Sequence, residues 1–131
     1  MQESKTAFSD SDPEAMRELL RGAEQFNSGR FFECHDTLEE LWQGMRGPAR
    51  NFLQGLIQIS VGFYHLGNGN LLGGESQLDK GMKNLSEYGD CYLRLDLVSL
   101  RREVQIWLEK VRKEENLRCT VADLPKYRFL P

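Results

Sequence analysis

Two side chains in the first third of the chain have the types and spacing that chemistry needs. His35 and Glu39 are four residues apart, so a helix would place them as neighbours on one face. An imidazole beside a carboxylate can act as a general base or bind a metal ion. His35 and Glu39 are therefore the candidate catalytic residues and, together with His65, the candidate metal ligands.

A second polar stripe follows along the chain, where Arg50, Gln54, Gln58 and His65 fall on one side of a helix. In a tight antiparallel hairpin turning near Arg46 and Gly47, residues at equal height have numbers that sum to about 93. Glu39 would then face Gln54, and His35 would face Gln58. An unpaired buried charge costs several kcal/mol. We therefore expect a hydrogen-bonded network around Glu39, with Arg50 or Gln54 as donor. The proposed network or binding set comprises His35, Glu39, Trp42, Arg50, Gln54 and Gln58.

The two histidines fall at different heights in this scheme. His65 matches Ser28 and lies beside Asn27, about 10 Å along the axis from the level of His35. Asn27 and His65 therefore form a second polar corner, and one metal ion held by both histidines is disfavoured. No HExxH motif is present. Cys34 directly precedes His35, and adjacent helical residues diverge by about 100°, so Cys34 is predicted to be a core residue rather than a nucleophile.

Hydrophobic spacing predicts an all-α fold, a single compact bundle of about five helices with an irregular C-terminal tail. The 24 residues from 51 to 74 include no Asp, Glu, Lys or Arg. Their many glutamines, asparagines and glycines argue against a membrane span and favour a central helix. The predicted helices run from Pro13 to about Ser28, Phe31 to Met45, Pro48 to the Gly67–Asn70 turn, Leu71 to Tyr88, and Leu97 to Val111, and no strand is predicted.

Glycines on the third and fourth predicted helices are spaced to share a face. Gly55 and Gly62 are seven residues apart, as are Gly74 and Gly81. Each costs helix propensity of about 1 kcal/mol, so we expect close contact between these helices to offset the cost.

Length and charge favour one cytoplasmic domain over 1–131, with an arm at 1–12 and a tail packed on the bundle at 117–131. A net charge of -3 argues against nucleic acid as a partner. The polar first twelve residues do not form a secretory signal. The odd number and wide spacing of the three cysteines predict buried, reduced thiols. No cofactor and no membrane partner is predicted, and the sequence carries no signal for an oligomeric state.

The segment 26–74 resembles the family catalogued as domain of unknown function 309. The resemblance rests on FNSGRFFECH, HDTLEELW, GPARNFLQGLIQ and YHLGNGN. It implies a compact helical fold, and descriptions of the family include a predicted metal-dependent hydrolase. The residues that correspond to the family motifs are Glu33, His35, Glu39, Trp42, Arg50, Gln54, Gln58 and His65. Asp36 stands where the family commonly has a glutamate.

Three classes of function fit these features. The first, which we favour, is a non-catalytic scaffold or binding module for a protein partner, with the polar network fixing the helix register. The second is a pocket for a small anionic ligand, with Arg50 as anchor, Gln54 and Gln58 as hydrogen-bonding groups and Trp42 as a wall. The third is a metal-dependent hydrolase that holds a divalent metal and uses Glu39 or His35 as base.

Overall fold

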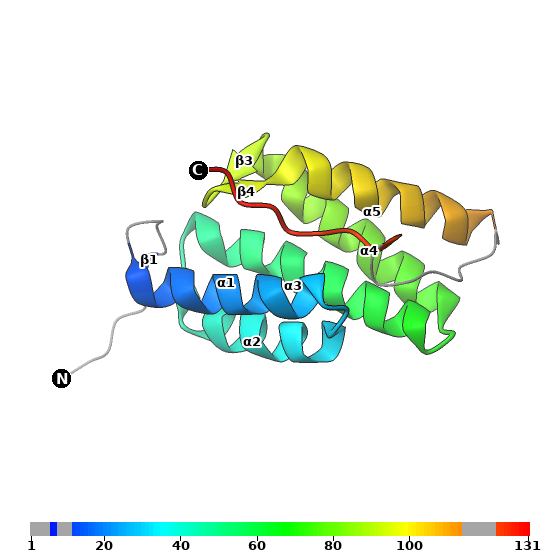
Figure 1. Cartoon of the computed structure of the whole chain (residues 1–131), viewed down its shortest axis with the longest axis horizontal. Coiled ribbons are helices and arrows are strands. Elements are labelled where there is room, and N and C mark those ends of the chain that lie inside the picture. The colour runs from blue at the N-terminus through cyan, green and yellow to red at the C-terminus, as the bar shows by residue number, and fades with distance from the viewer. Residues whose placement is uncertain (1–5, 8–11, 114–122) are drawn as a thin grey trace.

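The computed structural model describes residues 6–7, 12–113 and 123–131. In these ranges five α-helices pack together, which confirms the predicted all-α bundle (Figure 1). Each helix begins where the sequence predicts, after an Asp cap, at a proline or beyond a glycine turn. The helices are α1 (Pro13–Asn27), α2 (Phe31–Gln43), α3 (Pro48–Gly67), α4 (Leu71–Leu85) and α5 (Leu97–Arg112). None of the described helices is both long and apolar enough to cross a membrane.

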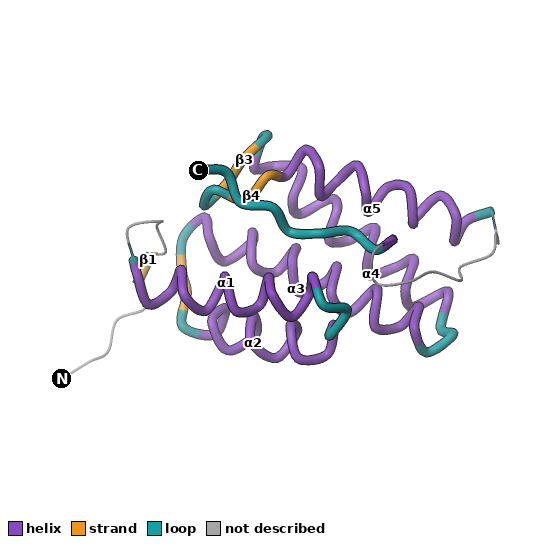
Figure 2. Tube along the Cα trace, viewed as in Figure 1, coloured by secondary structure: helices purple, strands orange, loops and turns teal. Residues whose placement is uncertain are grey.

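Helix α3 is the centre of the bundle. It packs against α2 and against α4, while α1 covers α2 and α5 covers α4 (Figures 1 and 2). Phe52, Leu56 and Ile59 on α3 are fully buried. The absence of charged residues from 51 to 74 is therefore explained largely by the neighbours that surround α3.

The α3 and α4 glycines allow the close contact that their spacing predicts. A Cβ on Gly81 would lie 2.8 Å from the carbonyl oxygen of Gly55. A Cβ on Gly74 would lie 3.2 Å from the carbonyl oxygen of Gly62. Backbone therefore meets backbone between the two helices, which only glycine permits here without a shift.

The prediction that no strand would occur is wrong for four two-residue segments. β1 (Thr6–Ala7) pairs in parallel with β2 (Met45–Arg46), and β3 (Cys91–Tyr92) pairs antiparallel with β4 (Leu95–Asp96). Two residues are too few to show an alternating pattern, so nothing in the sequence signals them. Helix α2 ends at Gln43, with Gly44 as its C-cap, so Met45 belongs to β2 rather than to the helix. Helix α4 likewise ends earlier than Tyr88, because a short 3₁₀ helix, η1 (Ser86–Tyr88), follows it.

The tail 123–131 is irregular chain, as predicted, and it runs along the bundle (Figure 2). Residues 117–122 of the predicted tail lie outside the described residues. The Asn27 side chain clamps the tail: Nδ2 donates to the Tyr127 carbonyl at 3.0 Å, and Oδ1 accepts from the Tyr127 amide at 2.7 Å. Tyr127 is 3% exposed. Further along the tail, Phe129 forms a bridge with Leu95. Asn27 thus holds the tail on the bundle.

Candidate functional site

The helical pair of His35 and Glu39 forms as its spacing predicts. His35 Nε2 lies 2.7 Å from Glu39 Oε2, and His35 Nδ1 lies 3.2 Å from Asp36 Oδ1. The histidine therefore has a carboxylate at each ring nitrogen. The expected buried network around Glu39 is corrected in two respects: the side chain of Glu39 is 43% exposed, and its partner is His35 rather than Arg50 or Gln54.

The side chain of Arg50 is hydrogen-bonded to the backbone at the end of α2. Its Nη1 donates to the carbonyl oxygens of Trp42 at 3.1 Å and Met45 at 3.0 Å. Its guanidinium lies 3.9 Å from the centre of the Trp42 ring. The last carbonyls of a helix have no partners within the helix and carry partial negative charge, so a cation binds there readily. Arg50 therefore caps α2, and Trp42 supports it through a cation–π contact.

The polar stripe of α3 is divided between its two neighbours: Arg50 contacts the end of α2, whereas Gln58 faces α4. Gln58 Oε1 accepts a hydrogen bond of 2.7 Å from Asn84 Nδ2 on α4. Gln54 is partly buried on the same stripe. The hairpin geometry placed Gln58 level with His35, but α3 lies between α2 and α4, and the stripe is wide enough for its members to face either neighbour. The amide of Gln58 thus joins α3 to α4.

His65 lies with His35 rather than with Asn27, which corrects the second polar corner. Both histidines line one hollow of about 190 Å³, which we call the histidine hollow. The prediction separated the two histidines because it compared only the positions of their backbones along the hairpin axis. It did not include the reach of the side chains. The hollow is lined by Phe32, His35, Val61, Tyr64 and His65.

The described residues offer few metal ligands in one place. Across 12–113 and 123–131, no three His, Cys, Asp or Glu side chains form a group that could hold a metal ion. Catalytic zinc sites generally take three protein ligands. His35 and Glu39 would contribute two ligands, and in the structure their side chains pair with each other.

A buried polar cluster that sequence reasoning missed joins α2, α3 and the tail. Cys34 Sγ lies 3.2 Å from Ser60 Oγ, and the Ser60 hydroxyl donates to the Leu56 carbonyl at 3.0 Å. The Tyr127 hydroxyl is buried beside Cys34 and Ser60. Burial raises the pKa of the Cys34 thiol to about 12. Cys34 is thus a buried thiol, as predicted, whereas Cys91 is exposed, contrary to prediction, and Cys119 lies outside the described residues.

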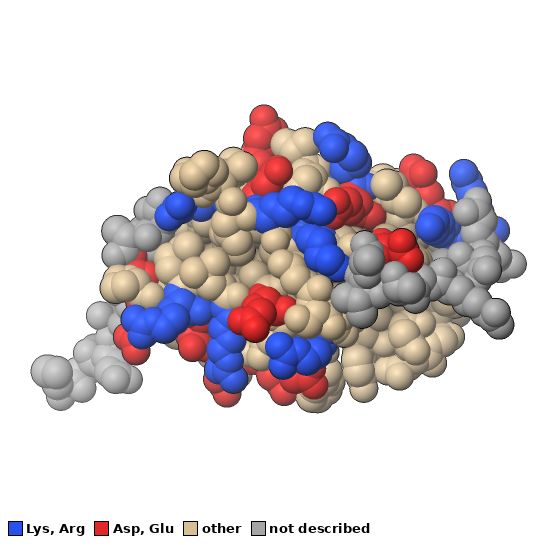
Figure 3. All heavy atoms as spheres, viewed as in Figure 1, with Lys and Arg blue, Asp and Glu red and all other residues tan. Residues whose placement is uncertain are grey.

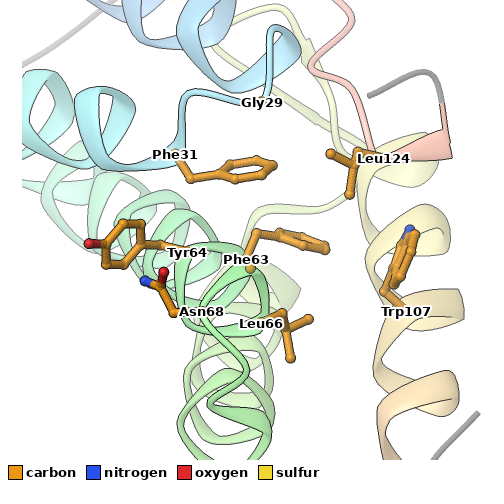
Figure 4. Close-up of a pocket in the computed structure, with 9 residues that line it drawn as sticks. Gly29, Phe31, Phe63, Tyr64, Leu66, Asn68, Trp107 and Leu124 are labelled. Atoms are coloured by element: carbon orange, nitrogen blue, oxygen red, sulfur yellow. The ribbon is translucent and has the colours of Figure 1, made fainter. Parts of the chain in front are cut away.

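A larger pocket opens between the N-terminal end of α2, the C-terminal end of α3, and α5 (Figure 4). We call it the aromatic pocket; its volume is about 310 Å³. The rings of Phe31 and Phe63 stack with centroids 5.4 Å apart, and Trp107 meets Phe63 edge to face at 6.3 Å. Trp107 Nε1 donates to the Asp123 carbonyl at 3.3 Å, which joins the indole to the tail. The lining residues are Gly29, Phe31, Phe63, Tyr64, Leu66, Gly67, Asn68, Trp107 and Leu124.

None of these lining residues carries a carboxylate, imidazole, thiol or amine. The helical spacing of Trp107 among apolar residues indicates burial and gives no sign of a gap in the packing. The pocket arises where the tail crosses the ends of the helices, so only the tertiary structure reveals it.

A known family model matches the segment that contains the α2–α3 hairpin. Residues 19–76 match the family model described as a domain of unknown function, DUF309. The segment 19–76 belongs to the DUF309 family. A search of curated proteins gave no match to the chain.

The DUF309 segment contains part of α1, all of α2 and α3, and the first residues of α4. It therefore supplies His35, Glu39 and His65 as well as Phe31 and Phe63 of the aromatic pocket. Trp107 and Leu124 lie outside the segment. The pocket is thus completed by α5 and the tail.

Proposed function

We propose that this DUF309 protein is a non-catalytic binding module that takes an uncharged aromatic or aliphatic group into the aromatic pocket. The observation that carries the proposal is an open hollow of about 310 Å³ whose walls hold no charged side chain. Sites for small molecules are concave and mostly apolar, with a few polar groups that orient the ligand, and begin at roughly 300 Å³. Asn68 at the wall offers one such amide group.

The aromatic walls favour a flat apolar group. Phe31, Phe63 and Trp107 present ring faces and edges at mutual distances of 5.4 and 6.3 Å. A further ring packed against them would gain both the burial of its surface and offset or edge contacts of about 0.5–1.5 kcal/mol per pair. A charged group would lose its hydration in this pocket without finding a counter-charge among the lining residues.

This proposal differs from the two alternatives in the chemistry it needs. An anionic ligand anchored by Arg50 would have to compete with the Trp42 and Met45 carbonyls that Arg50 binds. A hydrolase would use Glu39 or His35, which lie outside the aromatic pocket and are bonded to each other. The aromatic pocket contains no group suited to a general base, so its geometry supports binding rather than turnover.

Indole titration followed by ¹H–¹⁵N NMR tests the proposal. Nine ring atoms at about 0.45 kcal/mol each, between the efficiencies of drug-sized and of the best very small ligands, give a Kd of about 1 mM. The expected result is saturable movement of the Gly29, Gly67 and Asn68 amide signals and of the Trp107 indole N–H signal. No saturable change up to several millimolar, or changes confined to other surfaces, would refute the proposal.

A matched pair of variants locates the binding. Gly67 ends α3 at the pocket wall, and a Cβ there would meet nothing within 4 Å. Gly67→Leu should place a side chain over the pocket and weaken indole binding at least fivefold. Gly44 follows α2 at the other end of the hairpin, with its nearest neighbour 3.8 Å from an added Cβ. Gly44→Leu should leave binding unchanged.

A further inference from the structure

The histidine hollow adjoins the aromatic pocket, because Tyr64 lines both. Phe32 and Tyr64 are 50% and 40% exposed, and their ring centroids are 5.4 Å apart. In Figure 4 the Tyr64 ring points away from Trp107 and Leu124. Single exposed hydrophobic residues are ordinary, whereas neighbouring exposed rings beside two apolar hollows are typical of an interaction surface.

The charges along α2, beside the histidine hollow, are mostly acidic, whereas at the aromatic pocket the Lys110 ammonium lies 4.6 Å from the centre of the Trp107 ring. From residue 31 to residue 45 the chain has four acidic residues and no Lys or Arg; Arg30, directly before α2, is the nearest preceding cation. His35 lies between Asp36 and Glu39, so this group of three is net negative whether the imidazole is neutral or protonated. Arg50 is engaged at the other end of the hairpin. On the face shown in Figure 3, the surface over the turn between α3 and α4 shows no charged side chain, whereas the end of α5 above it shows several.

We propose that the histidine hollow and the aromatic pocket together dock a basic segment of a partner protein. Two apolar side chains of the segment enter the two hollows, one on each side of Tyr64, and a Lys or Arg between or beside them pairs with Asp36 and Glu39. The inference rests on the proposed function, since one of the two apolar groups occupies the aromatic pocket. It adds the second anchor and the charge of the partner.

Shape and charge favour this occupant over two others. A single rigid small molecule does not fill two hollows with Tyr64 between them, whereas two side chains of one segment do. A second copy of this chain in a two-fold dimer would bring the same surface against itself. The acidic side chains of α2 would then approach one another, and like charges oppose such a contact.

A pair of short fluorescein-labelled peptides tests the proposal by anisotropy. Both carry two leucines one helical turn apart; one has lysines at the flanking positions and its twin has glutamates. The full chain should bind the lysine peptide at least tenfold more tightly than the glutamate peptide. Asp36→Asn combined with Glu39→Gln should reduce that ratio to about threefold or less, because the complementary charges are gone.

Variants of exposed hydrophobic residues separate this inference from the proposed function. Phe32→Ser should lower the affinity for the lysine peptide about tenfold, because Phe32 lines the histidine hollow. It should leave indole binding unchanged, because Phe32 does not line the aromatic pocket. Leu20 on α1 is 46% exposed, and Leu20→Ser is the control that should change neither.

Equal affinity for the two peptides, no binding of either, or full affinity in Phe32→Ser overturns the inference. If indole still titrates the aromatic pocket in that event, the proposed function stands. If indole does not bind the unmodified protein, both the proposed function and this inference are overturned. Concentration-dependent dimers that Phe32→Ser abolishes in sedimentation would assign the surface to a second copy and overturn the partner proposal.

Discussion

Replacing Gly81 with alanine probes the contact that holds α3 and α4 together. The added Cβ would lie 2.6 Å from Ile59 Cγ1, 2.8 Å from the Gly55 carbonyl oxygen and 3.2 Å from the Ile59 amide nitrogen. The Ile59 side chain can rotate, but two of the three atoms belong to the backbone of α3. The helices must therefore separate by several tenths of an ångström to admit the methyl group.

Two opposing effects set the size of the change. Alanine gains about 1 kcal/mol over glycine in a helix interior. Overpacking a tight site costs about 1–3 kcal/mol, and a backbone contact that cannot rotate away belongs at the upper end. The net loss of unfolding free energy is then about 2 kcal/mol. In a chain of this length each kcal/mol lowers Tm by about 3–5 °C, so Tm should fall by about 6–10 °C.

Thermal and urea unfolding followed by circular dichroism measure the effect. Gly67→Ala is the matched control, because Gly67 also lies in a helix and a Cβ there would meet nothing within 4 Å. It should leave stability unchanged or raise it by up to about 1 kcal/mol. A Gly81→Ala variant as stable as the unmodified protein, or a Gly67→Ala variant equally destabilised, would refute the close-contact argument.

Three further predictions concern polar groups. Cys34 has a pKa raised to about 12 by burial, so the folded state keeps a proton that the unfolded thiol loses above about pH 9. The stability of the protein relative to Cys34→Ala should fall by about 2 kcal/mol between pH 8 and pH 10.5 in urea unfolding, and a constant difference would contradict this. Asn27→Asp replaces the donor to the Tyr127 carbonyl with an acceptor; stability should drop by about 1–3 kcal/mol and tail amides should exchange faster, whereas unaltered exchange would show that Asn27 does not hold the tail. Glu39→Gln should change the unfolding free energy by less than about 1 kcal/mol, because the carboxylate is half exposed and pairs with His35 alone among α2 and α3 side chains; a loss above about 2 kcal/mol would indicate a larger network.

Local rules explain how well the helices could be predicted. The Asp12 and Asp96 side chains accept from the backbone amides of Ala15 and Ser99, as expected of N-caps. The i, i+4 spacing likewise placed His35 beside Glu39. These features depend on residues a turn apart, which the sequence specifies directly.

The partners of the longer side chains could not be predicted in the same way. Arg50 and Gln58 were assigned from backbone height, yet Arg50 binds carbonyls at the end of its own hairpin and Gln58 bonds to Asn84 on α4. Side-chain reach and competition among neighbours decide such contacts. Both depend on where the third and fourth helices lie.

The sequence by itself determined the helical class, the helix starts, the central place of α3 and the glycine contact with α4, since periodicity, caps and the absence of charge act locally or along one helix face. Only the tertiary structure decided that His35 and His65 share a hollow, that Asn27 clamps the tail, and that an aromatic pocket opens beside them. Each of these joins segments up to 100 residues apart in the chain. Such contacts follow from how the helices and the tail pack, and no single stretch of the sequence encodes them.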